Sequence, residues 1–237
     1  MIADPRAVAA RWPEPRLRAL AELACITTEA PWELSRAHHA RARAAGLSDD
    51  EVLHAIALAA FFGHLNRIAD AVDVPLDYAV RREPPRTERA VPPFHAAPAP
   101  VAAAPAPVAA APAPVAAAPA LALEQRAQTA ERLAAWMEHV ARPSAALDGA
   151  RRARIAQHVG RLLGTATGAA APRDELDHAL IALAERVTLA PWALDAASYA
   201  PLRAAGLTDR DVFDACVVAT SAGVASRIEV ALTALGR

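Results

Sequence analysis

The chain has 237 residues, enough for one large domain or two small ones, and a formal net charge of −1. No basic face stands out at this charge, so the composition argues against nucleic acid as a partner. Hydrophobic residues make up 54 % of the chain but aromatic residues only 4 %, because alanine dominates. Alanine has the highest helix propensity and little burial energy, which predicts an all-α protein.

The N-terminal residues show no apolar segment of the kind that directs secretion. No apolar run reaches the ~20 residues that span a bilayer. We therefore expect a soluble, cytoplasmic protein without membrane association.

The first predicted helix begins at Pro15, since a proline lacks the N–H that would be unpaired at that position. An apolar stripe at helical spacing follows, and the segment 27–31 interrupts it. A second helix is predicted over 32–45. Gly46 suits the left-handed position just beyond the end of that helix.

Ser48 and Glu51 form a predicted capping box at the start of the next helix, 49–62. The second half of this helix is apolar on nearly all sides, so we expect it to be buried on every side. Gly63 is interpreted as a point of close packing, with the helix continuing or restarting over 66–72.

The segment 86–121 differs in composition, because Pro-Ala-Pro-Val-Ala-Ala-Ala recurs in it every seven residues. Proline at this density forbids a continuous helix. The segment can bury only a small apolar surface, which does not offset the entropy lost when the chain is ordered. We expect a disordered, semi-extended Pro/Ala-rich linker that acts as a tether between 1–85 and 122–237.

The C-terminal part repeats the N-terminal part at a constant offset of 160 residues. Ala30-Pro31-Trp32 recurs at 190–192, and the run 43–49 recurs at 203–209 with a single Ser-to-Thr difference. Over residues 20–73, roughly 23 of about 54 aligned positions are identical, which chance does not give at a fixed offset. The sequence therefore predicts two copies of one helical unit.

The second copy has an additional N-terminal piece with two predicted helices, 123–141 and 146–163. A loop is expected at 165–172, and the helix 174–187 then repeats the first helix of copy one.

The repeated segments resemble the alkylhydroperoxidase D-like and carboxymuconolactone decarboxylase family. The resemblance rests on 184–192 with 202–209 in the second copy, and on 43–52 with 61–70 in the first. It covers about 60 residues in each copy. It implies tandem multihelical, all-α repeats that commonly assemble into trimers or hexamers.

The peroxidase branch of that family carries a CxxC pair followed by a histidine. The resemblance would place these residues on Pro31, Leu34 and His38 in copy one, and on Pro191, Leu194 and Ser198 in copy two. Neither copy has the thiols, and Gly164–Gly168, a candidate remnant of another CxxC, has none either. Disulfide-based peroxide reduction needs a thiolate and a resolving thiol, so this chain lacks the family's redox route.

The two cysteines of the chain, Cys25 and Cys216, occupy non-equivalent positions of the copies. They form no CxxC motif, and we interpret them as small buried hydrophobic residues.

A residual non-thiol site is the remaining chemical hypothesis, and its polar residues are confined to copy one. An imidazole with a pKa near 6.5 can act as a general acid or base, and a nearby carboxylate can orient it. The candidate catalytic residues are His38, Glu33 and His64, with His39 and Arg67 for substrate binding. The alternative is solvated or carbonyl-capping histidines.

No HxxxH or HExxH spacing is present, so no metal and no cofactor are expected. Arg67 and its counterpart Arg227 are interpreted first as forming an ion pair or a carbonyl cap, and second as recognising an anion. Two functions therefore stand side by side. One is a peroxidase-related, decarboxylase-like enzyme, and the other is a catalytically inactive helical binding or assembly module.

We expect the two copies to pair within the chain through their apolar helices, 55–62 and 215–225. Phe61 and Phe62 correspond to Ser221 and Ala222, and larger side chains opposite smaller ones suit such a contact. Further homo-oligomerisation and a small-molecule ligand are the other expected interactions.

Overall fold

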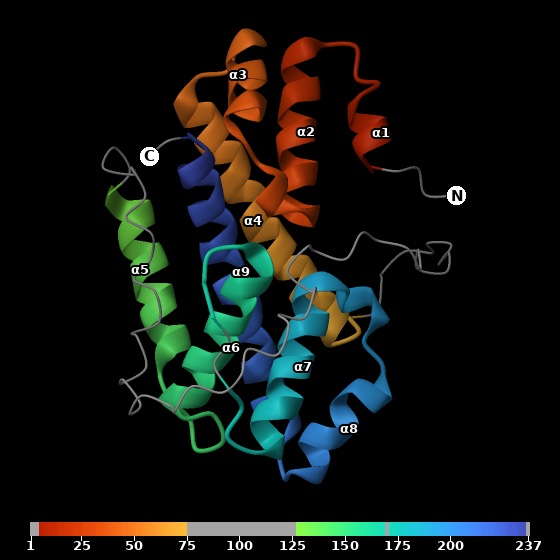
Figure 1. Ribbon diagram of the computed structural model, residues 1–237, viewed down its shortest axis with the longest axis vertical. Coiled ribbons are helices and arrows are strands. Elements are labelled where there is room, and N and C mark those ends of the chain that lie inside the picture. The colour runs from red at the N-terminus through yellow and green to blue at the C-terminus, as the bar shows by residue number, and fades with distance from the viewer. Residues whose placement is uncertain (1–4, 75–126, 169–170, 236–237) are drawn as a thin grey trace, which may run out of the picture.

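The structure, a computed structural model, describes residues 5–74, 127–168 and 171–235. Within these residues every regular element is helical and no strand is present (Figure 1), which confirms the all-α prediction. The predicted linker 86–121, and the predicted boundaries on either side of it, lie outside the described residues.

The N-terminal part contains two short helices, two long helices and a 3₁₀ turn. Its elements are α1 (Pro5–Ala9), α2 (Pro15–Glu29), the 3₁₀ helix η1 (Pro31–Glu33), α3 (Arg36–Ala44) and α4 (Asp49–Ala71). The predicted capping box is present, because the Glu51 N–H donates to Ser48 Oγ while Glu51 Oε2 accepts from the Ser48 N–H at 2.9 Å.

Two predicted helix bounds were wrong in this part. The helix expected over 32–45 begins only at Arg36, because Pro31–Glu33 form a separate 3₁₀ turn. Helix α2 extends to Glu29, into the segment 27–31 where the sequence predicted the break. Of the two alternatives for 66–72, continuation is correct, since α4 has no break at Gly63 and ends at Ala71. A single glycine costs a helix only about 1 kcal/mol, which the packing described below offsets.

The C-terminal part begins with α5 (Ala127–Ala141) and α6 (Gly149–Leu163). It continues with α7 (Glu175–Leu189), η4 (Pro191–Ala193), α8 (Ala196–Ala204) and α9 (Asp209–Leu235). The bounds of α7, η4 and α8 are those of α2, η1 and α3 with 160 added, and α9 begins 160 residues after α4. The offset in the sequence therefore recurs in the elements.

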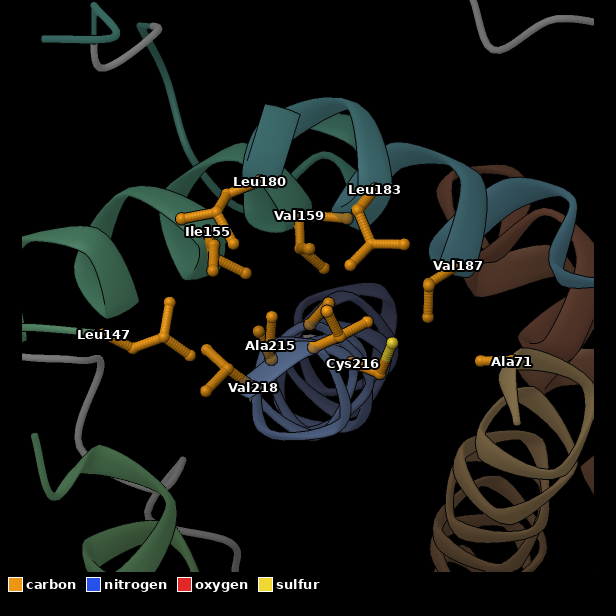
Figure 2. Close-up of a cluster of buried hydrophobic side chains, with 14 of the residues drawn as sticks. Ala71, Leu147, Ile155, Val159, Leu180, Leu183, Val187, Ala215, Cys216 and Val218 are labelled. Carbon is orange, nitrogen blue, oxygen red and sulfur yellow. The ribbon is translucent and has the colours of Figure 1, made fainter. Parts of the chain in front are cut away.

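Helix α9 lies at the centre of the molecule, packed against α4 on one side and against α6 and α7 on another (Figure 1). The largest cluster of buried side chains surrounds it (Figure 2), with Ile155, Val159 and Leu180 among its members. Helix α2 packs on α4 at the far end.

The hydrophobic clusters contain residues of both parts. Ala71 of α4 belongs to the cluster around α9 (Figure 2), and Ala231 of α9 belongs to the cluster of α2 and α4. A third cluster joins Ala60 to Val224 and Ile228. The two parts thus bury apolar surface against each other.

Helix α4 is not buried on every side, which corrects the expectation from its composition. Its inner side chains face the protein, but four large apolar side chains on the opposite face are 43–58 % exposed: Leu58, Phe61, Phe62 and Leu65. The contact with α9 is made by small residues such as Ala60 and not through Phe62. Only α9, which has helices on several sides, is buried as expected.

Candidate functional site

Glu33 and His38 lie near each other at the start of α3, but each has a local partner. The His38 Nδ1 atom lies 2.8 Å from the Ser35 hydroxyl oxygen. The Glu33 carboxylate accepts from the Arg6 guanidinium at 2.8 Å. Partial burial, and then the charge of Arg41, lower the pKa of His38. The ring is therefore held in place as a neutral group near the surface.

His39 joins α3 to the beginning of α4. Its Nε2 atom lies 2.9 Å from Asp49 Oδ1, and Arg43 donates to both oxygens of the same carboxylate at 2.7 Å. Hydrogen bonding from Arg43 is the main cause of the lowered pKa of Asp49. This contact between neighbouring helices leaves the His39 Nε2 atom occupied.

His64 is buried at the contact of α4 with α5 and α9. Its ring meets the Trp136 ring edge-on at a centroid distance of 5.0 Å, and Phe61 stacks on it at 6.1 Å. Burial lowers the pKa of His64, and a hydrogen bond to the Thr220 backbone opposes this only in part. Its Nδ1 atom has no hydrogen-bond partner in the described part of the chain.

The described contacts do not join the three candidate catalytic residues into one site. Within the described residues, no hydrogen bond or ion pair links His64 to His38 or to Glu33. His38 and Glu33 lie beside η1 and α3, while His64 is sealed beneath Trp136 on α5. A substrate held at His38 would therefore find Glu33 nearby but not His64.

Arg67 and Arg227 reach across to the ends of α7 and α2. The Arg67 Nε atom donates to the Thr188 carbonyl oxygen at 3.1 Å, and its NH2 donates to that of Thr28 at 3.0 Å. Arg227 donates to the carbonyl oxygens of Thr27 at 3.1 Å and Thr28 at 3.4 Å. These hydrogen bonds agree with the carbonyl-cap interpretation of both arginines.

A glycine one turn earlier makes room for each guanidinium. Arg67 NH1 donates to the Gly63 carbonyl at 2.9 Å, and Arg227 NH1 donates to the Gly223 carbonyl at 3.1 Å. A Cβ atom at either glycine would lie 2.8 Å from that nitrogen. The sequence carried this signal, since glycine and arginine recur together at the same offset in both copies.

Sequence reasoning missed Tyr199, which stands where the first copy has His39. Its hydroxyl donates to the Ala71 carbonyl oxygen at 2.5 Å, at the end of α4. Burial is the largest cause that raises the pKa of this phenol to about 12. No spacing in the sequence could reveal a contact between residues so far apart.

A cavity of about 330 Å³ lies between η1, the end of α6 and α9. Trp32 and Leu34 form one wall, and Gly164 and Thr165 form another. The resemblance would place a thiol at Leu34, and it marks Gly164–Gly168 as a remnant of a second CxxC. Leu34 and the first two residues of 164–168 therefore line the same space, and Glu229 is the one carboxylate among the described residues around it.

The cysteines lie elsewhere. Cys216 is buried in the cluster around α9 (Figure 2), and burial raises the pKa of its thiol to about 12. Cys25 is half-buried on α2. In the described residues, no three His, Cys, Asp or Glu side chains form a group that could hold a metal ion.

The fold and these contacts define an all-α protein whose polar candidate residues each serve a local or cross-helix contact. No family model, no curated protein and no solved structure matches this chain. Two helices of the described part, α4 and α9, are long and apolar enough to cross a membrane by length and composition. This is weak evidence, because the core helix of a soluble protein passes the same test.

Proposed function

We propose that the chain is a degenerate member of the alkylhydroperoxidase D-like and carboxymuconolactone decarboxylase family. In this proposal it has two copies, 1–85 and 122–237, joined by the linker 86–121, and it works in the cytoplasm. Its role is that of a non-catalytic helical binding and assembly module, which lacks the redox CxxC of the family.

The dispersal of the polar residues carries this proposal. General acid–base catalysis needs its groups within hydrogen-bond reach of one substrate. Glu33 is paired with Arg6, His39 with Asp49, and His64 is buried under Trp136. The donors of Arg67 that could recognise an anion are directed at carbonyl oxygens. Catalysis or anion binding by Glu33, His39 or Arg67 would require each of these residues to leave its present partner.

An assay for peroxide turnover tests the proposal, and we expect no turnover. Full-length protein, assayed with hydroperoxides and a dithiol reductant, is expected to give the same rate as buffer with reductant. The Cys216 thiol, with its pKa at about 12, offers almost no thiolate at neutral pH. A rate that exceeds the control and disappears in Cys25→Ser or in His38→Ala would overturn the non-catalytic role.

The cavity beside Trp32 supports a second candidate, the binding of a small molecule. Its volume of about 330 Å³ falls at the lower end for ligand sites, and it combines an apolar wall with the polar residues Thr165, Glu229 and Thr233. Such a site fits a small molecule with an apolar body and one hydrogen-bonding group.

Ligand-observed NMR with a set of small aromatic amines and carboxylates tests this second candidate. Thr233→Trp places a large side chain at the exposed edge of the cavity and is expected to abolish any binding. Binding that survives in Thr233→Trp would assign the ligand to another place.

A further inference from the structure

The outer face of α4 presents four large apolar side chains to solvent. They are spaced three, four and seven residues from the first, and they form what we call the α4 apolar face: Leu58, Phe61, Phe62 and Leu65. Their exposed fractions are 44, 45, 58 and 43 %, respectively. Exposed apolar side chains that lie together on one face of a helix are often an interaction site.

The equivalent face of α9 shows what a covered face looks like in the same fold. The counterparts of Leu58, Phe61 and Phe62 are Val218, Ser221 and Ala222, which are all buried. Side chains of α5 and α6 cover them: Met137, Val140 and Ala156 meet these residues around a cavity of only about 10 Å³. Within the described residues, no helix covers this face of α4 in the way that α5 and α6 cover α9.

The equivalent faces of α4 and α9 also differ in the size of their side chains. Ser221 and Ala222 are small, so another helix can approach the α9 backbone closely. Phe61 and Phe62 project from α4 and would keep a helix placed like α6 at a distance. A helix that packs on the α4 apolar face therefore lies at a larger distance between helix axes, which leaves room for large side chains of the partner.

The face is complementary to itself. The steps between its four residues are three, one and three, so the order Leu-Phe-Phe-Leu is the same in either direction along the helix. If two α4 helices pack antiparallel about a two-fold axis, Phe61 lies against the partner's Phe62, and Leu58 lies against the partner's Leu65. A two-fold contact brings the same patch of both chains together, so that residue i meets j and j meets i.

We propose that the α4 apolar face is a homodimer contact, with a second copy of this chain as its occupant. The inference rests on the proposed assembly role and names the partner in it. Four half-exposed side chains supply a few hundred Å² on each chain, less than the roughly 600 Å² per partner of a stable interface. We therefore expect a weak dimer whose formation depends on protein concentration.

Sedimentation velocity of the full chain over a range of concentrations tests this. Wild type is expected to pass from monomer to dimer as its concentration rises through the micromolar range. Phe62→Glu should remain a monomer at concentrations at least ten times higher, because dimerisation would bury unpaired charges. Phe213→Glu is the matched control, since Phe213 is a 44 % exposed aromatic side chain on α9, and it should dimerise like wild type.

Cross-linking tests the antiparallel arrangement. In a Cys25→Ser background, chains with Leu58→Cys are mixed with chains with Leu65→Cys and treated with a short bismaleimide. The mixed product should exceed both like-with-like products, whereas a parallel pair would favour the like-with-like products and overturn the geometry.

Two results would overturn the homodimer itself. One is a wild-type chain that stays monomeric at every concentration, as expected if residues 75–126 or another protein occupied the face. The other is a dimer that persists in Phe62→Glu, which would use a different surface. Neither result would restore catalysis, so the failure of this inference is distinguishable from the failure of the proposed non-catalytic role.

Discussion

Arg227 donates from Nε to the carbonyl oxygen of Thr27 at 3.1 Å, across 200 positions of the chain. Arg67 makes the reciprocal contact, from Nε to the Thr188 carbonyl oxygen. These carbonyls lie in the last turns of α2 and α7, where helices leave carbonyl oxygens without an intrahelical partner and favour a nearby cation. Each arginine therefore caps a helix of the other half.

Loss of the Arg227 cap should destabilise the whole fold. Arg227 is only 4 % exposed, and Arg227→Met would leave the Thr27 carbonyl without this donor in a buried position. We expect a loss of about 2–4 kcal/mol in the free energy of unfolding, measured by urea denaturation. Arg203→Met, which removes a surface pair with Asp209, should change it by no more than about 0.5 kcal/mol. Equal midpoints for the two variants would contradict the role of Arg227.

Gly223 and Arg227 should act as one unit. Gly223→Ala alone puts a Cβ atom 2.8 Å from the Arg227 NH1 atom, so the guanidinium must move off its carbonyl partners. In an Arg227→Met background the clash is absent, and the same substitution should stabilise α9 by up to about 1 kcal/mol through helix propensity. A double-mutant cycle is expected to give a coupling of at least about 1 kcal/mol. Additive effects would show that the glycine serves another purpose.

The burial of His64 makes stability depend on pH. Its folded pKa lies below the ordinary value of 6.5, so the unfolded chain binds a proton more readily than the folded one. The stability contributed by the neutral ring is complete above pH 6.5 and is lost as the pH falls through the folded pKa. The free energy of unfolding should therefore fall by up to about 1.4 kcal/mol per pH unit in that range.

His64→Val is the matched variant for this prediction, because Val224 occupies the equivalent position of α9. The difference in unfolding free energy between wild type and variant should change between pH 7 and pH 5. If the two curves run parallel over this range, His64 is not the group that titrates.

The hydrophobic clusters that contain residues of both halves predict that each half needs the other in order to fold. Chains 1–74 and 127–237, expressed together as separate polypeptides, should co-purify as one helical complex without any covalent link. Expressed alone, either chain should show reduced helical circular dichroism, because Ala60, Ala71 and Ala231 would lose the buried surfaces they pack against. Two stably folded halves that do not associate would contradict this.

Local chemistry in the sequence predicted the local structure well. The Ser48 and Glu51 capping box, the start of α2 at Pro15 and the left-handed Gly46 follow from short-range rules, and the structure has each of them. The same rules gave η1 wrongly as part of a longer helix, because the proline at position 31 can open either kind of turn.

The candidate site depended on contacts that spacing does not encode. His64 is covered by Trp136, and Tyr199 bonds the end of α4, through packing between helices distant in the sequence. The exposure of Phe62 was missed for a related reason. Apolar composition shows that a helix can be buried. The number of helices packed around it decides how many of its sides are buried.

The unequal cover of α4 and α9 also limits how far an assembly can grow. If α4 and α9 both had an exposed apolar face, each chain would have two interaction faces. Chains could then join one after another into a filament. Helices α5 and α6 cover the face of α9, which leaves the face of α4 exposed. A contact between two α4 helices would bury that face on both chains. The proposed association through α4 would therefore end at a pair and would not continue into a polymer.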